Sequence, residues 1–280
     1  TRYSLQSRGL GDVYKRQTHR YRDWKPEGHG EVNLRDALTQ SCDVFFYEIS
    51  GDVGIDNMHD YLDQFGLGRA TGIDISGEHP GINPSRDWKR ASFRQRDDKR
   101  WYHGETVINS IGQGYMLATP LQLASAAGAL ATRGTRFEPH LVAAVEDALT
   151  GERTLIPPQR LADVRVNDQT YWETVIGGMH DVMQNIRGTA YAVGGGAPYE
   201  MAGKSGTAQV ISISQEDEYD EEEIAERLRD HALFIAFAPL HNPRIAVAVI
   251  VENGSSGSRV AAPFARAIMD EYLGYGDDAP

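Results

Sequence analysis

Two apolar runs near the C-terminal end constrain the fold of this chain more than any other feature. Residues 231–239 (HALFIAFAP) and 245–251 (IAVAVIV) lack the polar alternation of a half-exposed strand. Such runs are typical of central strands covered on both faces. A third strand is expected over residues 202–211, where Ala208 and Val210 alternate with polar side chains. The three strands follow one another closely along the chain, which favours an antiparallel sheet.

Several helices are expected around this sheet. Asn33 has the character of an N-cap, and the apolar residues after it predict one helix up to Ile49 that carries Ser41 and Cys42 on its apolar side. Thr119, with Pro120 at the first helical position and Gln122 three residues on, predicts a capped helix that packs in the core. Further helices are expected over residues 58–65, 171–184 and 261–272. We expect short strands at 72–75 and 141–146 and a loop over 76–100.

The composition limits the class of protein. With 280 residues, 40% hydrophobic and 24% charged, the chain suits one large or two small globular domains. A net charge of -12 argues against a nucleic-acid partner, and the acidic run at 216–230 predicts a solvated loop. No apolar run reaches the roughly 18 residues that span a bilayer, and no signal peptide opens the chain. Cys42 is the single cysteine, so an internal disulfide is excluded and both cytoplasm and periplasm remain open.

The domain boundaries are expected near the two ends. Residues 1–17 (TRYSLQSRGLGDVYKRQ) show neither helical nor strand periodicity, and we interpret them as a disordered foreign leader rather than part of the fold. A native disordered tail is the alternative. Residues 18–275 are expected to form the globular domain, and residues 276–280 a tail.

The strand expected at 202–211 carries a site-like segment, residues 204–207 (KSGT). Two interpretations compete for it. A phosphate-binding loop needs a glycine five positions before Gly203 and a helix after it, but the chain has Pro198 there and continues as a strand. The other is the Lys-Ser/Thr-Gly box of serine acyltransferases that react with β-lactams, in which the cation and hydroxyls hold a carboxylate. Alone, the tetrapeptide is a weak signal.

Two further groups of residues upstream have the character of a site. Residues 41–43 (SCD) form an S-x-D triplet of the kind that supplies a second catalytic serine in the same enzymes, although ordinary polar helix residues are the far commoner explanation of an isolated triplet. A carboxylate, an imidazole and a thiol lie within twenty residues of one another, on Asp23, His29 and Cys42. All three groups bind zinc in proteins. From spacing alone, a buried cysteine beside a surface histidine is as good an explanation.

Taken together, these residues resemble the penicillin-binding protein transpeptidases, and most closely their cell-elongation subfamily. The resemblance covers residues 18–273 and rests on seven segments in the family's order: 20–25 (RYRDWK), 28–30 (GHG), 41–47 (SCDVFFY), 111–115 (IGQGY), 118–122 (ATPLQ), 204–210 (KSGTAQV) and 224–231 (IAERLRDH). It implies an α+β, three-layer fold: a central antiparallel sheet flanked by helices, beside an all-helical part.

The resemblance also implies roles for individual residues. The catalytic set is Ser41, Asp43, Lys204, Ser205, Gly206 and Thr207, of which Ser41 belongs to the proton-transfer network around the nucleophile. The substrate-binding set is Lys204, Ser205, Thr207 and Gln209, with one backbone N–H after Thr207 contributing to an oxyanion hole. The subfamily has a structural zinc site whose ligands fall on Asp23, His29 and Cys42, with a fourth ligand upstream.

One departure from the family concerns the nucleophile, which belongs to an S-x-x-K box. No serine in the 280 residues has lysine three positions later. We therefore expect this sequence to be the C-terminal part of a longer protein, inactive alone. The intact protein is expected to be a peptidoglycan D,D-transpeptidase that uses a serine acyl-enzyme. A non-catalytic penicillin-binding-like module and a D,D-carboxypeptidase are the alternatives.

Partners and location follow from the same resemblance. We expect peptidoglycan stem peptides and β-lactams as ligands, a membrane glycosyltransferase and other elongation-complex proteins as partners, and no nucleic acid. The implied location is the bacterial inner membrane, with this domain facing the periplasm.

Overall fold

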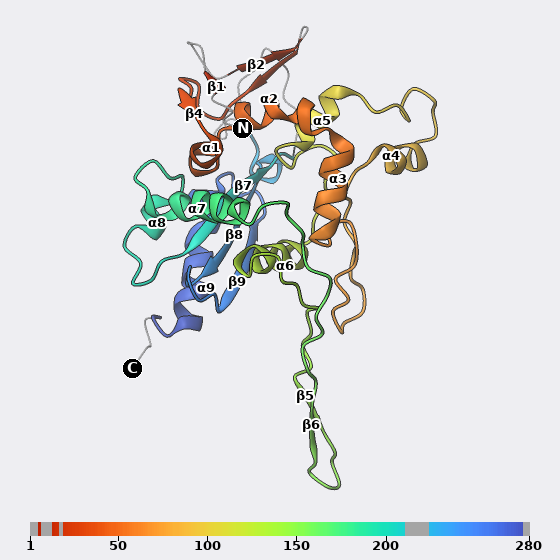
Figure 1. Ribbon diagram of the computed structural model, residues 1–280, viewed down its shortest axis with the longest axis vertical. Coiled ribbons are helices and arrows are strands. Elements are labelled where there is room, and N and C mark those ends of the chain that lie inside the picture. The colour runs from red at the N-terminus through yellow and green to blue at the C-terminus, as the bar shows by residue number, and fades with distance from the viewer. Residues whose placement is uncertain (1–4, 7–12, 17–18, 211–223, 277–280) are drawn as a thin grey trace.

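A three-stranded antiparallel sheet forms the centre of the computed structural model of the protein (Figure 1). The structure describes residues 5–6, 13–16, 19–210 and 224–276. The sheet has the order β7-β8-β9, built from Ala202–Ala208, His231–Ala238 and Ile245–Val251. All three strands were predicted, and so was their antiparallel pairing. The register places Lys204 of β7 opposite Ile235 of β8.

Helices cover both faces of this sheet. One face packs against α6 (Pro120–Ala131) and α7 (Thr170–Gln184), and the other against α9 (Ala262–Leu273) and the π-helical turn η2 (Gly257–Ala261). Because β8 is covered on both sides, Phe234 belongs to one buried cluster and Phe237 to another. This arrangement confirms the expected α+β fold, in which continuous apolar strands lie between helical layers.

Five helices form the upper part of the molecule in Figure 1, beside and above the central sheet. They are α1 (Leu34–Gln40), α2 (Asp43–Val53), α3 (Ile55–Gln64), α4 (Arg86–Ser92) and α5 (His103–Asn109). A short α8 (Tyr191–Gly194) packs against α7 and α9, and a 3-10 turn η1 (Glu226–Leu228) precedes β8. Three two-stranded pairs lie outside the central sheet: β1 (Leu5–Gln6) with β4 (Glu31–Val32), β2 (Val13–Arg16) with β3 (His19–Arg22), and β5 (Ala144–Glu146) with β6 (Arg153–Leu155).

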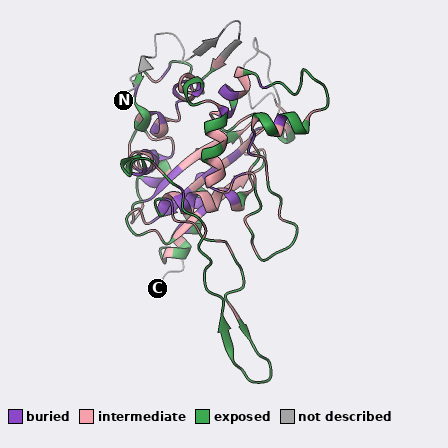
Figure 2. Ribbon diagram, turned by 45° about the vertical axis from the view of Figure 1, so that its right-hand side comes forward, coloured by how far each residue is buried: buried purple, intermediate pink, exposed green. Residues whose placement is uncertain are grey.

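The hairpin β5–β6 projects from the body of the molecule and is exposed except at the half-buried Ala144 (Figure 2). The expected strand at 141–146 corresponds to its first arm. The prediction of a strand at residues 72–75 is wrong. There, the Asp74 carboxylate accepts hydrogen bonds from the backbone N–H groups of Leu141 (2.7 Å) and Val142 (2.9 Å), so this segment anchors the base of the hairpin instead of pairing with a strand.

Other expectations need correction in the first hundred residues. The loop expected over 76–100 contains α4, whose first turn is capped by the Ser85 hydroxyl, which accepts from Trp88 N. The leader, residues 1–17, was expected to stay outside the fold, but its described residues form β1 and β2, each paired with a later strand. The rest of the leader, the first part of the acidic run and the last residues of the tail lie outside the described residues. The foreign origin of the leader stays a prediction.

The helix capped by Thr119 is confirmed in detail. The Thr119 hydroxyl accepts from Gln122 N at 3.2 Å, and the Gln122 side-chain oxygen accepts from Thr119 N at 2.9 Å. The amide nitrogen of the same side chain donates to the carbonyl oxygens of Arg69 (2.6 Å) and Pro80 (2.7 Å). Gln122 is 1% exposed, so this one residue caps α6 and fixes it to the loop that leads to α4.

Candidate functional site

Lys204 on β7 and Ser41 between α1 and α2 meet at one hydrogen bond. Lys204 Nζ donates to Ser41 Oγ at 2.8 Å and to the carbonyl oxygen of Ser205 at 2.9 Å. Burial lowers the pKa of Lys204 to about 8, and the negative charge of Asp43 acts in the opposite direction. The two segments that were singled out separately in the sequence therefore form one site, with a cation held in place at its centre.

Ser41 does not lie inside a helix, as expected, but at a break between two helices. Its backbone is left-handed (φ 55°, ψ 48°), and the turn closes α1 through a hydrogen bond from Cys42 N to the Ala37 carbonyl at 2.9 Å. For a residue other than glycine, this conformation costs roughly 1–2 kcal/mol. Trp24 stabilises it, because its indole N–H lies 3.0 Å from the Ser41 carbonyl oxygen. The break directs the serine hydroxyl toward β7.

Asp43 begins α2, directly after this break. Burial raises the pKa of the Asp43 carboxyl to about 7, the nearby Asp23 carboxylate raises it further, and Lys204 and His29 act in the opposite direction. Asp23 also accepts a hydrogen bond from Asp43 N at 2.8 Å, which is favourable at the positive end of a helix. The S-x-D triplet thus places a hydroxyl and a titratable carboxyl on the same side of the site as Lys204.

The C-terminal end of β7 is held by a residue that sequence reasoning did not select. Gln113 Nε2 donates to the Thr207 carbonyl oxygen at 2.6 Å, and Gln209 N donates to Gln113 Oε1 at 3.4 Å. Gln113 lies between two glycines with positive φ, Gly112 (81°) and Gly114 (80°), which let the backbone turn sharply toward the strand. The glycine-punctuated segment was noticed in the sequence, but nothing in it indicated the partner.

The other residues of the predicted 204–207 box lie along the same strand. The Ser205 hydroxyl is 3.3 Å from Thr189 Oγ1, a second contact that the sequence did not predict. Thr207 is exposed. At Gly206 the chain itself approaches β7 closely, because a Cβ on Gly257 of η2 would lie 2.5 Å from the Gly206 carbonyl oxygen.

The three predicted metal ligands come together beside Ser41. The ligand atoms of Asp23, His29 and Cys42 all lie within 4.8 Å of one another, and His29 Nδ1 is 3.5 Å from Asp23 Oδ2. Asp23 and Cys42 are buried. Tetrahedral zinc with bonds of about 2.0–2.3 Å holds its ligand atoms about 3.3–3.8 Å apart, so a small contraction of this group fits the ion. The donor set of thiolate, imidazole and carboxylate is also one that zinc accepts.

Comparison with known proteins decides the family. The penicillin binding protein transpeptidase domain matches residues 8–270. The chain belongs to the penicillin-binding protein transpeptidase family. This family match extends into residues 8–17 of the leader, which the sequence analysis had left outside the domain.

The curated relatives of this transpeptidase chain include two D,D-transpeptidases. The chain is 40% identical over 263 residues to the peptidoglycan D,D-transpeptidase MrdA of Haemophilus influenzae, covering 93% of this chain and 39% of that protein. It is 42% identical over 256 residues to MrdA of Escherichia coli K12, covering 91% of this chain and 39% of that protein. The chain thus spans about two fifths of the length of these relatives.

Solved structures agree with the fold of this transpeptidase chain. Pseudomonas aeruginosa PBP2 in complex with WCK 5153 superposes with a TM-score of 0.79 at 40% identity, covering 97% of this chain and 56% of that one. Helicobacter pylori PBP2, in its complex with MreC, gives a TM-score of 0.77 at 31% identity, covering 95% of this chain and 45% of that one. The predicted resemblance to the cell-elongation subfamily of penicillin-binding protein transpeptidases is confirmed. Among the helices that the structure describes, none has the length and apolar character needed to cross a membrane.

Proposed function

We propose that the full-length protein is a peptidoglycan D,D-transpeptidase of cell-wall elongation that works through a serine acyl-enzyme and binds penicillin. The hydrogen bond of 2.8 Å from Lys204 Nζ to Ser41 Oγ carries this proposal, because it unites the cationic strand with the S-x-D triplet. The names of the curated relatives support the reaction and its substrate.

In the proposed reaction, the nucleophilic serine comes from a part of the protein outside these 280 residues. It attacks the carbonyl between the two terminal D-alanines of a stem peptide, the peptide C–N bond breaks, and D-alanine leaves with a proton. An amine of a second stem peptide then attacks the acyl-enzyme, releases the serine and completes the cross-link. Water in place of the amine gives the carboxypeptidase reaction.

Several residues of the site have roles in these steps. Lys204 donates to Ser41 Oγ, so the hydroxyl proton of Ser41 points away from Lys204 and can pass to the leaving D-alanine. Ser205 and Thr207 lie on β7 and, with the Lys204 cation, bind the terminal carboxylate of the substrate. Gln113 fixes the end of β7, where one backbone N–H after Thr207 contributes to the oxyanion hole.

Zinc is proposed to be a structural ion held by Asp23, His29 and Cys42, with a fourth ligand from outside the sequence. It would hold the loop before α1 against the start of α2 and thereby support the left-handed turn at Ser41. No step of the reaction passes through it. The contact from Asp23 to Asp43 N at 2.8 Å links this group directly to the S-x-D triplet.

The proposed location is the periplasmic face of the bacterial inner membrane, with elongation-complex proteins and a membrane glycosyltransferase as partners. A solved complex of Helicobacter pylori PBP2 with MreC and a solved peptidoglycan synthase complex that aligns with 99% of this chain support this assignment. The proposed substrate, peptidoglycan, and the proposed partner proteins are found at the periplasmic face of the inner membrane.

One experiment distinguishes the proposed reaction from its two alternatives. The full-length protein is incubated with a stem pentapeptide and an acceptor peptide, and D-alanine and cross-linked dimers are measured by mass spectrometry. A transpeptidase produces both, a carboxypeptidase produces D-alanine without dimers, and a binding module produces neither. Dimer formation that depends on Lys204 supports the proposal. Absence of dimers contradicts the proposal.

A further inference from the structure

A cavity of about 210 Å³ lies between the end of α3, one side of α6 and the segments that lead into and out of the β5–β6 hairpin. Figure 1 shows these elements on the side of the central sheet that α6 covers. The residues used below are Phe65, Thr71, Ser125, Thr135, Arg136 and Leu161, all in the wall of the cavity. No lining residue belongs to the proposed acyl-transfer site. The cavity is smaller than the roughly 300–1,000 Å³ of pockets for drug-sized molecules, so it fits a small one.

The charged side chain in the wall, Arg136, has no acidic partner. Its Nη1 donates to the Gln64 carbonyl oxygen at the end of α3 at 2.6 Å, and no carboxylate among the described residues forms an ion pair with it. Burial lowers the pKa of Arg136, and the nearby positive charge of Arg69 acts in the same direction. The acid that opposes this effect, Asp63, is itself paired with Arg69. A half-buried guanidinium therefore presents an uncompensated charge and further N–H donors to the cavity.

The rest of the wall combines apolar side chains with hydroxyl groups. Phe65 and Leu161 supply apolar surface, and Ser125 and Thr135 can donate to an anion. Phe65 is 9% exposed, whereas Phe137 at the opposite side is 48% exposed, so the cavity has an apolar interior and an open mouth. A ligand with an apolar body and one anionic group would satisfy both kinds of surface.

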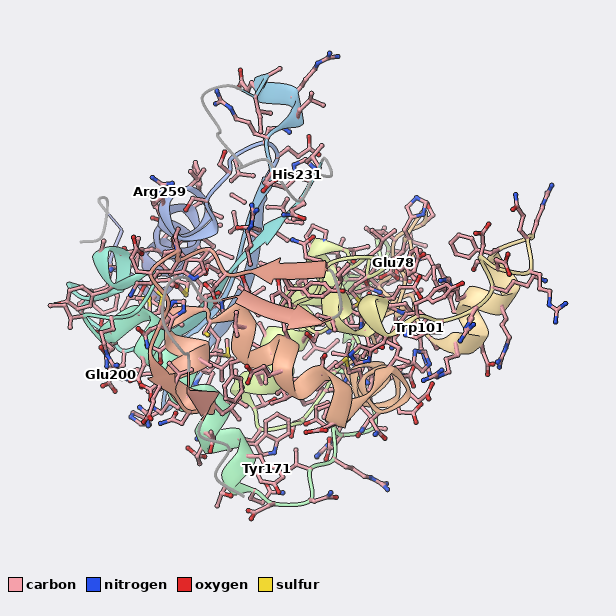
Figure 3. All side chains as sticks on the ribbon, turned by 90° about the horizontal axis from the view of Figure 1, so that it is seen from above. Glu78, Trp101, Tyr171, Glu200, His231 and Arg259 are labelled. Carbon is pink, nitrogen blue, oxygen red and sulfur yellow. The ribbon has the colours of Figure 1, made fainter. Side chains whose placement is uncertain are left out.

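The loop that forms one wall of the cavity is fixed by hydrogen bonds. Glu78, labelled in Figure 3, accepts from Thr71 N at 2.7 Å and from Gly72 N at 3.2 Å. On the other side of Ala70, the Arg69 carbonyl oxygen accepts from Gln122 Nε2 at 2.6 Å. The cavity is thus preformed, and a ligand does not have to order this loop when it binds.

Charge and geometry select one class of anion. Arg136 contributes one positive charge, and the pair of Arg69 with Asp63 contributes none, so a monoanion balances the cavity and a phosphate dianion exceeds it. The planar guanidinium also matches the two oxygens of a carboxylate.

We infer that this cavity binds a small organic carboxylate, whose anionic group pairs with Arg136 and whose apolar body lies against Phe65 and Leu161. The inference goes beyond the proposed transpeptidase function and does not depend on it. It gives the protein a second carboxylate site, built on α3 and α6 and separate from Lys204 on β7.

Fluorine NMR titrations of the full-length protein with 4-fluorobenzoate and its neutral analogue, 4-fluorobenzamide, test the inference. All titrations use the Lys204→Ala background, because Lys204 is also proposed to bind a carboxylate. The benzoate should bind about tenfold more tightly than the amide, since only the benzoate pairs with the guanidinium. Arg136→Gln should lower the affinity for the benzoate by about tenfold and leave that for the amide unchanged.

Two further variants separate the cavity from its charge. Ser125→Leu places a larger side chain in the cavity from the half-buried side of α6 and should weaken both probes several-fold. Arg153→Gln, at an exposed arginine of β6, is the matched control and should change neither. N-acetyl-4-fluorophenylalanine carries the same anionic group at the end of a peptide unit. Tighter binding than the benzoate would indicate a peptide terminus as the natural ligand, and weaker binding a free acid.

Other outcomes overturn the inference. Equal affinities for benzoate and amide would leave the guanidinium without a role, and tighter binding of 4-fluorophenyl phosphate would make the cavity a dianion site. A lower melting temperature of Arg136→Gln with unchanged benzoate affinity would make Arg136 a cap of α3 alone. Equal losses in Arg136→Gln and Arg153→Gln would indicate general attraction by surface charge, and absence of benzoate binding would exclude the site.

Discussion

Lys204 Nζ lies 2.8 Å from Ser41 Oγ, although 163 residues separate the two in the chain. The contact joins the central sheet to the helical part of the molecule. It also depends on two local conformations: the strand register that turns Lys204 toward α1, and the left-handed backbone of Ser41.

Removal of the cation should slow acylation. In the full-length protein, Lys204→Ala should lower the rate constant for labelling by fluorescent penicillin by about 10²- to 10³-fold, because a positioned charged donor is lost. Ser41→Ala should lower it too, and the double variant should lose less than the product of the two effects, since both remove the same contact. Lys99→Ala, at an exposed lysine, is the control. Additive losses would contradict a shared role.

Binding of a carboxylate should depend on pH through Lys204. Burial lowers the pKa of Lys204 to about 8, so the ammonium is present below this pH and is lost above it. The affinity for N-acetyl-D-alanyl-D-alanine should therefore fall by about tenfold between pH 7 and pH 9. Lys204→Arg stays charged over this range and should show no such fall. A wild-type affinity that stays flat to pH 9 would exclude this role.

Metal content should depend on the cysteine. The purified full-length protein should contain about one zinc per chain by mass spectrometry, and Cys42→Ser should lower this content and the melting temperature together. His29→Ala should behave in the same way, whereas His79→Ala, at an exposed histidine, should keep its zinc. Unchanged metal in both ligand variants would disprove the site.

Gln122 should contribute more to stability than an ordinary helix cap. Gln122→Ala removes the cap to Thr119 and leaves the carbonyl oxygens of Arg69 and Pro80 without their donor, so the free energy of unfolding should fall by about 2–4 kcal/mol. Thr119→Ala, which removes only its own cap, should cost about 1 kcal/mol. Urea denaturation measures both. Equal losses would show that the two carbonyl contacts contribute nothing.

The sequence predicted those elements whose signals are local. Thr119, Pro120 and Gln122 carry the cap of α6 in adjacent positions, and the apolar runs of β8 and β9 indicate strands that are covered on both faces. The helix α7 also follows from its own periodicity. These patterns need no knowledge of what packs against them.

The break at Ser41 was missed because its causes are distant in sequence. Nothing near Ser41 requires a left-handed backbone, and the apolar spacing continues across it. The indole of Trp24, the carboxylate of Asp23 and the ammonium of Lys204 hold the turn from two other segments of the chain. Tertiary contacts here override the local preference for a continuous helix.

Only part of the candidate site was predicted from the sequence. The resemblance identified Lys204 and Ser41 from their motifs, and the structure places the two in contact. Gln113 and Thr189 were missed, because a side chain that binds a strand edge or a neighbouring hydroxyl has no motif of its own.

The most direct test of the acyl-transfer account is fluorescent-penicillin labelling of this 280-residue chain beside the full-length protein. The account predicts a covalent label on the full-length protein, formed far more slowly in its Lys204→Ala variant, and no label on the 280-residue chain. A covalent label on the 280-residue chain would contradict it, because a nucleophile would then lie within residues 1–280 and the role given to Ser41 would be wrong.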